Sequence, residues 1–382
     1  MVDFVTSVFA TDGFLIGTLL PFLFVLLIVV FVHELGHYLV GRWCGIGAKI
    51  FSVGFGPELA GFTDRRGTRW RLSLIPLGGY VKFVGDMNAA SMPEGQDDPS
   101  LSPEERKFAF QNKSVARRAA TVFAGPLANF IFAVVIFTAI FSVFGRGVAD
   151  PVASEVRPGS VAESVGILPG DRFISLDGKP VVQFSDVQRY VSVRSGEPIE
   201  MVMERDGELL TFIVTPKRLE IEDRFGNKME QGIIGVLNNR QTGGQRIEQY
   251  GLGQSFVMAV TETAYVVQRT GGYIGGIFSG REKPDQIGGP IRVAKMSGQV
   301  ATLGFVALLN LAAILSISIG LLNLLPIPIL DGGHLLFYFF EAIRGRPVPE
   351  NAQEYGYRIG FGLILGLMVF ATWNDVTSLF GG

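Results

Sequence analysis

The chain has 382 residues, of which 48% are hydrophobic and only 18% are charged. Soluble globular domains carry about 25% charged residues, so this composition favours a protein that is embedded in a lipid bilayer. The 33 basic and 35 acidic residues leave a net charge of −2. A nucleic-acid-binding protein needs a basic excess, so we expect no nucleic-acid partner.

Cysteine and histidine are scarce, which limits the chemistry available to the chain. The single cysteine, Cys44, excludes an internal disulfide and a zinc site built from cysteine ligands. There are three histidines, His33, His37 and His334. Any histidine-based chemistry must therefore use these three.

Four apolar stretches are candidates for membrane-spanning helices, for which roughly 20 residues suffice. A signal peptide is not expected at the first stretch, because no basic residue precedes it and no small-residue cleavage site follows it. We predict a polytopic α-helical membrane protein with about four transmembrane helices, at about 13–40, 119–144, 300–325 and 356–374.

The basic residues predict how the chain is oriented in the membrane. Residues 41–118 contain twelve Lys and Arg, whereas residues 1–12 contain none. Because basic loops stay on the cytoplasmic side, we expect segment 41–118 to be cytoplasmic. Alternation of the spans then places segment 145–299 outside and segment 341–358 inside.

A metal-binding motif lies near the inner end of the first predicted span. His33, Glu34 and His37 form the pattern H-E-x-x-H. On a helix, residues i and i+4 share one face, so both imidazoles can bind one cation, and zinc suits neutral imidazole. Glu34 can take a proton from a water that the metal activates. The alternative is a set of polar side chains at headgroup level, but ionisable residues in a membrane helix usually have a function.

Between the first two spans the sequence predicts a β-hairpin or small sheet in region 48–83. Residues 65–83 read RRGTRWRLSLIPLGGYVKF, with apolar and polar residues alternating, and glycines at 54, 56, 78 and 79 permit tight bends. Such a sheet can lie partly in the membrane if other parts of the protein cover its edges.

A β-rich module is predicted between the second and third spans. Residues 158–181, PGSVAESVGILPGDRFISLDGKPV, followed by a candidate helix at 184–193, resemble a PDZ domain, which binds peptides by adding a strand to a sheet edge. An inert β-rich spacer is the alternative. We assign 145–220 to this extracytoplasmic PDZ module. Region 221–299 is then a connection that contains an amphipathic surface helix at 252–280.

A catalytic zinc needs a third protein ligand, for which the sequence offers two candidates. The third span ends in NLLPIPILDGGH, residues 323–334. Asp331 is the only acid between residues 300 and 340, two prolines break the helix before it, and two glycines follow it. Irregular backbone at membrane depth is tolerated where it lines a cavity. His334 is a rival ligand, and Asp331 could instead cap a helix. Periodicity does not separate Asp331 from His334.

Seven features occur in an order that resembles the site-2 protease family, most closely its bacterial regulator-of-sigma-E protease branch. The resemblance covers nearly the whole chain. It rests on HELGH, GFGP (54–57), PLGGYVKF, FAGPLANF (123–130), the PDZ-like module, GGPIRVAK (288–295) and NLLPIPILDGGH. The membrane core of such a protein would comprise segments 1–144 and 300–382. Some members of this branch carry two PDZ modules, whereas only one is recognisable here.

This resemblance implies roles for individual residues. In the family the two histidines and the aspartate of LDG bind zinc, which assigns His33, His37 and Asp331 as ligands and ranks Asp331 above His334. The family's glutamate is the general base, which corresponds to Glu34. The residues that the family uses to handle substrate correspond to Asn323, Pro326 and Pro328. The hairpin after the first span would present the substrate as an extended strand.

The resemblance also implies an activity and a location. The chain would be an intramembrane zinc metalloprotease of the cell inner membrane, with its active site toward the cytoplasm and its PDZ module in the periplasm. Its substrates would be single-pass membrane proteins, such as anti-sigma factors, or remnant signal peptides. The rival functions are a catalytically inactive membrane PDZ scaffold and a metal transporter. The intact ligand set disfavours the first, and the lack of further acids or histidines in the spans disfavours the second.

Overall fold

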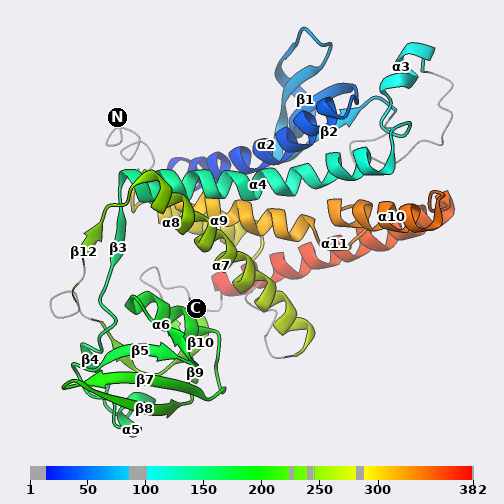
Figure 1. Cartoon of the computed structure of the whole chain (residues 1–382). Coiled ribbons are helices and arrows are strands. Elements are labelled where there is room, and N and C mark those ends of the chain that lie inside the picture. The colour runs from blue at the N-terminus through cyan, green and yellow to red at the C-terminus, as the bar shows by residue number, and fades with distance from the viewer. Residues whose placement is uncertain are drawn as a thin grey trace. The chain divides into compact units, whose positions relative to one another are not determined.

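The computed structural model describes residues 14–85, 101–222, 228–238, 244, 246–280 and 288–380. The chain divides into two compact units, which are described separately. Unit 1 comprises Met1–Ala139 and Phe256–Gly382 and is mainly helical, whereas unit 2 comprises Ile140–Ser255 and is rich in strands (Figure 1). The predicted start of the first span, residue 13, lies outside the described residues.

Among the described residues, four helices are long and apolar enough to cross a membrane. They confirm the prediction of a polytopic membrane protein with about four spans. The fourth helix begins at Glu350, earlier than hydropathy suggests. Hydropathy misses its first turns because they carry the charged residues Glu350, Glu354 and Arg358. The four are α2 (Leu20–Trp43, preceded by a π-helical turn, Phe14–Leu19), α4 (Val115–Val143), α9 (Phe305–Asn323) and α11 (Glu350–Phe380).

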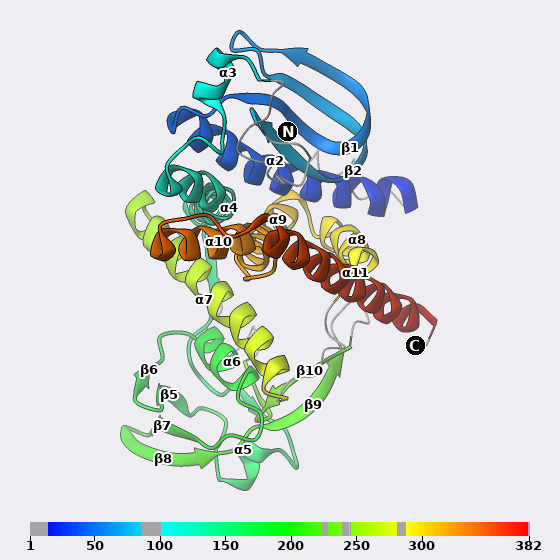
Figure 2. The same ribbon diagram turned by 90° about the vertical axis from the view of Figure 1, so that its right-hand side faces the viewer.

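Strands β1 (Ala48–Thr63) and β2 (Arg69–Phe83) pair antiparallel and pack along α2 (Figure 2). Both strands are bent. Residues 50–53 pair with 79–82 on one side and with 69–72 on the other, and 60–63 also pair with 69–72. The segments therefore follow one another across the sheet in the order 79–83, 48–53, 69–73 and 58–63.

Aromatic rings join this sheet to α2. Tyr38 of α2 meets Trp70 edge-on with ring centroids 5.0 Å apart, and Trp70 stacks on Phe51 at 4.2 Å. Phe51 is only 1% exposed. Burial of such large side chains stabilises the contact by roughly 1.5–3 kcal/mol each. The sheet is thus fixed one residue away from the second histidine of the H-E-x-x-H motif.

A single carboxylate closes the turn of the β1–β2 hairpin. Asp64 accepts hydrogen bonds from the backbone N–H groups of Arg66 and Thr68, from the Trp70 indole at 3.0 Å and from the Tyr38 hydroxyl at 3.1 Å. Burial raises the pKa of Asp64, but these bonds outweigh it and hold the pKa at about 2. The charged carboxylate therefore ties the turn to α2 at neutral pH.

Two of the remaining helices of unit 1, α8 and α10, are held by long-range polar contacts. Asp375 of α11 accepts from the backbone N–H groups of Gly289 and Arg292, both at 2.9 Å, and so caps α8. Arg118 of α4 pairs with Glu341 of α10 at 2.6 Å, and both side chains are nearly buried. The remaining helices are α3 (Pro103–Phe108), α7 (Leu252–Phe278), α8 (Pro290–Ala301) and α10 (Asp331–Arg344).

Unit 2 is built on a sheet in the order β6-β5-β7-β8. Strand β7 buries Ile199, Met201 and Met203, the period of two expected of a strand with one face in a core. Its elements are β3 (Arg146–Val148), β4 (Glu155–Val156), α5 (Val161–Ser164), β5 (Arg172–Leu176), β6 (Lys179–Pro180), α6 (Phe184–Ser192), β7 (Ile199–Arg205), β8 (Glu208–Val214), β9 (Lys217–Glu222), β10 (Lys228–Ile233), β11 (Val236–Leu237) and β12 (Arg246–Glu248).

The last strands of unit 2 pair back onto its first strands. Strand β11 pairs with β4, and β12 pairs with β3, both antiparallel. Strand β10 pairs with β9 and contacts α6. Unit 2 therefore extends to Ser255, beyond the boundary at residue 220 that the sequence suggested.

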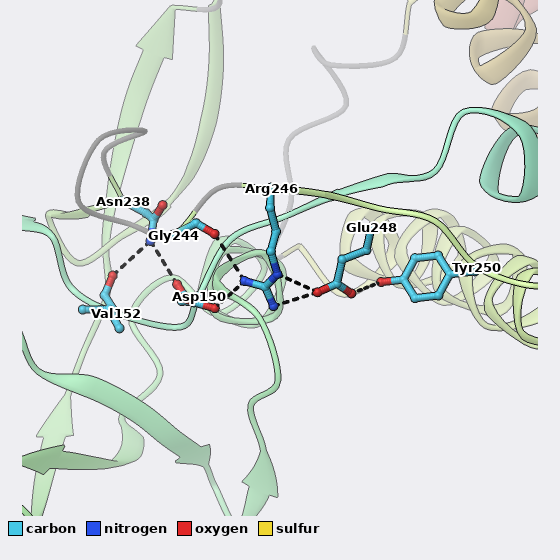
Figure 3. A network of polar contacts seen from close by, with 7 residues as sticks. All are labelled: Asp150, Val152, Asn238, Gly244, Arg246, Glu248 and Tyr250. Atoms are coloured by element: carbon cyan, nitrogen blue, oxygen red, sulfur yellow. Dashed lines mark hydrogen bonds and ion pairs between the residues drawn. The ribbon is translucent and has the colours of Figure 1, made fainter.

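A polar network links the two chain segments that enter and leave unit 2 (Figure 3). Arg246 donates to Asp150 at 2.8 Å and to Glu248 at 2.7 Å. Tyr250 donates to Glu248 at 2.6 Å, while the Asn238 amide donates to the backbone oxygen of Asp150 at 3.0 Å. The network adds side-chain contacts to the short β3–β12 ladder.

A second polar contact stabilises the core of unit 2. Asp171, 1% exposed, accepts two hydrogen bonds of 2.6 Å from Arg205 and one of 2.8 Å from the backbone N–H of Leu168. Burial raises the pKa of Asp171, but the contacts with Arg205 and Leu168 lower it more. The carboxylate is therefore more stable in the folded state than in the unfolded chain.

We predict that Arg205→Ala lowers the free energy of unfolding of unit 2 by about 1–3 kcal/mol, because it removes hydrogen bonds to a buried charge. Hydrogen exchange of unit 2 amides in the full chain, in detergent, would measure it. The folded-state pKa of Asp171 is lowered, so the difference from wild type should shrink as pH falls below about 3.9, the unfolded value. Arg172→Ala, at an exposed position on β5, is the matched control. Equal protection in both variants at neutral pH would contradict the prediction.

Candidate metal centre

Three candidate ligands from two separate parts of the chain meet in unit 1. His33 and His37 lie one turn apart on α2, and Asp331 is the first residue of α10. Nε2 of His33 is 3.2 Å from Oδ2 of Asp331, and Nε2 of His37 is 3.5 Å from Oδ1. The two Nε2 atoms are 3.2 Å apart. A ligand atom from each residue lies within 4.8 Å of the others.

These spacings fit a zinc ion. Zinc takes nitrogen and oxygen ligands at 2.0–2.2 Å in a tetrahedral arrangement, which puts neighbouring ligand atoms about 3.3–3.6 Å apart. The two Nε2 atoms are 3.2 Å apart, close to this value, and each lies 3.2–3.5 Å from a different oxygen of Asp331. Oδ2 of Asp331 is buried and receives no hydrogen bond. A buried carboxylate oxygen without a donor, facing two imidazoles, has the chemistry of a metal ligand.

Helix α4 holds the two imidazoles from behind. Nδ1 of His37 donates to the backbone oxygen of Thr121 at 2.9 Å, and Nδ1 of His33 is 3.2 Å from the Asn129 side chain. In metal sites the ring nitrogen that does not bind the metal usually donates to an oxygen, which fixes the ring and its tautomer. Both histidines therefore present Nε2 to the site, and α4 supplies the partners behind them.

Two glycines allow α2 and α4 to approach this closely. A Cβ on Gly125 would lie 2.2 Å from Nε2 of His37, so the imidazole occupies the space above this glycine. A Cβ on Gly36 would lie 2.3 Å from the backbone oxygen of Ala124. Small residues at helix–helix contacts let backbones approach inside a membrane. The HELGH and FAGP sequences thus meet in space.

Glu34 lies between the candidate ligands on α2 and faces the β sheet. Its Cγ is 3.0 Å from the position that a Cβ on Gly79 would take, and its carboxyl accepts a hydrogen bond from the backbone of Val81. A larger residue than glycine at 79 would therefore press on the Glu34 side chain as well as on Ser52 and Val30. Strand β2 thus runs alongside Glu34, the candidate general base.

A tight turn sets Asp331 at the start of α10. Leu330 donates its N–H to the oxygen of Ile327 at 3.0 Å, Pro328 precedes Ile329, and Ile329 has φ of +95°. These are the features of a type II turn, whose third residue is usually glycine. An isoleucine there is strained by roughly 1–3 kcal/mol, a feature typical of functional sites.

The other predicted site residues lie around this turn. Asn323 ends α9 and is half-buried, Pro326 is exposed, and Pro328 packs against Gly360 of α11. His334 is 7% exposed, and its Nδ1 is 3.4 Å from the hydroxyl of Tyr357. The group that could bind a metal contains Asp331 and not His334. Geometry thus favours Asp331 where periodicity left both open.

Sequence reasoning missed the contribution of α4. Thr121, Gly125 and Asn129 had no assigned role, although Gly125 and Asn129 lie in the FAGPLANF motif. One signal was available, since Asn129 is a polar amide within an uncharged apolar run, where an unpaired polar group is costly. The sequence did not show which other helix carries its partner.

Comparisons with known proteins agree with this centre. The model of peptidase family M50 matches residues 21–367. The chain is 54% identical over 375 residues to an Agrobacterium fabrum protein named "Putative zinc metalloprotease", across 98% of this chain and 100% of the relative. A protein of the same description from Rhizobium meliloti is 54% identical over 364 residues, 95% of this chain and 97% of the relative. Metalloprotease MmpA of Caulobacter vibrioides is 38% identical over 386 residues, 95% and 96% of the two chains.

The spans and the H-E-x-x-H centre define a multi-pass membrane protein with the site of a zinc metalloprotease. With the matches above, the chain belongs to peptidase family M50, the site-2 protease family, and zinc is its cofactor. The resemblance noted in the sequence is therefore confirmed at the level of the family.

We predict that Gly125→Ala strongly reduces the zinc content of the purified protein, because the added methyl group would displace the imidazole of His37. Metal analysis of the protein in detergent would measure this loss. Gly366→Ala is the matched control, since Gly366 lies in the membrane helix α11 and nothing is within 4 Å of an added Cβ. A Gly125→Ala variant that keeps full zinc would show that α2 and α4 can separate without cost to the site.

Proposed function

We propose that the chain is an intramembrane zinc metalloprotease, which hydrolyses peptide bonds within or next to transmembrane segments of single-pass membrane proteins. The observation that carries this proposal is the position of the candidate ligands. His33 and His37 lie on a helix long enough to cross the bilayer, and Asp331 follows another after a short turn. Anti-sigma-factor-like proteins and remnant signal peptides are the proposed substrates.

In this proposal, His33, His37 and Asp331 bind zinc, and Glu34 is the general base. Zinc, when bound, polarises the scissile carbonyl and lowers the pKa of the attacking water. Glu34 accepts the proton of that water and returns it to the departing amine. The hydrogen bond from Val81 and the contact with Gly79 hold the Glu34 carboxyl in place for this transfer.

A substrate helix must unwind before cleavage, since its amide groups are hydrogen-bonded within the helix. We propose that the β1–β2 sheet holds the unwound segment by strand addition. The passage of β2 alongside Glu34 supports this role, because a strand held there runs near the base. Asn323, Pro326 and Pro328 would contact the substrate from the turn that precedes Asp331.

We propose that unit 2 is a periplasmic PDZ-like module that gates access or binds a peptide. Its sheet, together with α6, which buries Phe184, Val187 and Val191 on one face, suits this assignment. The protein would then lie in the cell inner membrane with its metal centre toward the cytoplasm. The twelve basic residues of segment 41–118 support this orientation.

We predict that Glu34→Gln abolishes cleavage of a model transmembrane substrate but keeps zinc, because the amide cannot accept the proton. Asp331→Asn should lose both zinc and cleavage, whereas His334→Ala should keep zinc. Metal analysis and a gel-based cleavage assay on the same detergent-purified samples would measure the two properties.

The outcomes separate the competing functions. If wild type binds zinc but cuts no substrate, and Glu34→Gln behaves identically, the catalytically inactive membrane scaffold becomes the better description. If His334→Ala loses zinc and Asp331→Asn does not, the ligand assignment fails but the enzyme class survives.

A further inference from the structure

We propose that Asn129 is a positioning residue of the metal centre: its side-chain carbonyl accepts the Nδ1 proton of His33 and so fixes the tautomer that presents Nε2 to the metal. This inference deepens the proposed function, because it presumes that His33 binds zinc. Among the described residues, the hydrogen-bond partners of Asn129 include neither Glu34 nor the other candidate ligands, so its effect would pass through His33.

The contact is direct and dry. The Asn129 side chain is 0% exposed, and its amide lies 3.2 Å from Nδ1 of His33, which is itself only 9% exposed. Water therefore cannot replace the amide as a partner. An imidazole N–H that is buried without an acceptor is destabilised, so removal of the amide should disfavour the tautomer of His33 that carries its proton on Nδ1.

The chemistry of the site determines which amide atom must face the histidine. Nε2 of His33 is 3.2 Å from both Nε2 of His37 and Oδ2 of Asp331, so it needs its lone pair to bind a cation there. Nδ1 must then carry the proton and requires an acceptor. Of the two amide atoms of Asn129, only Oδ1 can accept.

In the structure the amide nitrogen of Asn129 lies next to Nδ1 of His33, and Oδ1 is buried without a partner. Oxygen and nitrogen of an amide occupy equivalent positions, and the choice between them follows from the hydrogen-bond network. Exchange of the two atoms gives His33 its acceptor and places Nδ2 in the buried position that Oδ1 held. The metal-binding tautomer therefore selects the orientation with Oδ1 toward His33.

The backbone around Asn129 is held independently of its side chain. Ser316 of α9, also 0% exposed, donates its hydroxyl to the backbone oxygen of Asn129 at 3.1 Å. A Cβ on Gly320 would lie 3.2 Å from Cβ of Asn129, so α9 packs closely at this point. Helix α9 thus fixes the position of the Asn129 backbone, and the side chain of Asn129 contacts His33.

The experiment compares Asn129→Asp with Asn129→Leu in the full chain. Aspartate keeps an acceptor of the same shape, so zinc affinity should stay within a few fold of wild type. Leucine keeps the size but removes the acceptor, and the zinc dissociation constant should rise about 10–100-fold, the usual effect of removing such a partner. Competition with a chromophoric chelator in detergent would measure both constants.

A second readout separates positioning from general damage. The chain has only three histidines, so ¹⁵N-histidine NMR can resolve their tautomers, with His33→Gln identifying the His33 signal. We expect Nδ1 of His33 to be protonated in zinc-loaded wild type and Asn129→Asp. In Asn129→Leu we expect a mixture of tautomers. Ser318→Ala, also on α9, is the control for packing, since it removes only a hydrogen bond to the backbone oxygen of Ile314 in the same helix, and should leave both zinc affinity and tautomer unchanged.

The results distinguish failure of this inference from failure of the proposed function. Equal zinc affinity and an unchanged tautomer in Asn129→Leu would overturn the role of Asn129, while zinc in wild type would leave the protease proposal intact. An Asn129→Asp variant as weak as Asn129→Leu would also overturn it, because the acceptor would then not matter. No zinc binding by wild type would overturn both.

Discussion

The metal centre depends on one close approach, between α2 and α4 at Gly36 and Gly125. Two imidazoles and a carboxylate inside a membrane protein are stable only where other groups satisfy their polar atoms. The approach places the backbone oxygen of Thr121 and the amide of Asn129 directly behind His37 and His33. A side chain at either glycine would clash with the facing helix or with the imidazole of His37, and would push α2 and α4 apart.

The same contact explains why α10 must be positioned so strictly. With the two histidines fixed by α4, the third ligand must come within about 3.5 Å of both, and it arrives from a distant part of the chain. The turn that contains Pro328 and the strained Ile329 sets the position of the first residue of α10. Gly332 and Gly333 have no side chains, so the first turn of α10 can pack closely against the backbone that precedes it. The ion pair of Arg118 with Glu341 then holds α10 on α4, the helix that supports the histidines.

Local features of this architecture could be predicted from the sequence, and features that need tertiary contacts could not. Helical spacing identified His33, Glu34 and His37, and apolar length identified the four spans. The choice between Asp331 and His334 required knowing which of them the turn aims at α2. The part played by Asn129 and the pairing of β11 and β12 with strands far back in unit 2 were missed. Hydrophobic periodicity reports which face is buried and does not report the partner.

Under the proposed function, the arrangement also separates two requirements that a protease inside a membrane must meet. The metal ligands need a rigid, dry support, and α4 provides it from the side of Nδ1. The substrate backbone would need access to the proposed base, Glu34, and strand β2 passes this residue at Gly79, where an added Cβ would lie 3.0 Å from the Glu34 Cγ. Asp64, charged at neutral pH, anchors the sheet to α2 through Tyr38, next to His37. One helix therefore carries the proposed base and two candidate ligands, with α4 packed behind the imidazoles and the β1–β2 sheet beside Glu34.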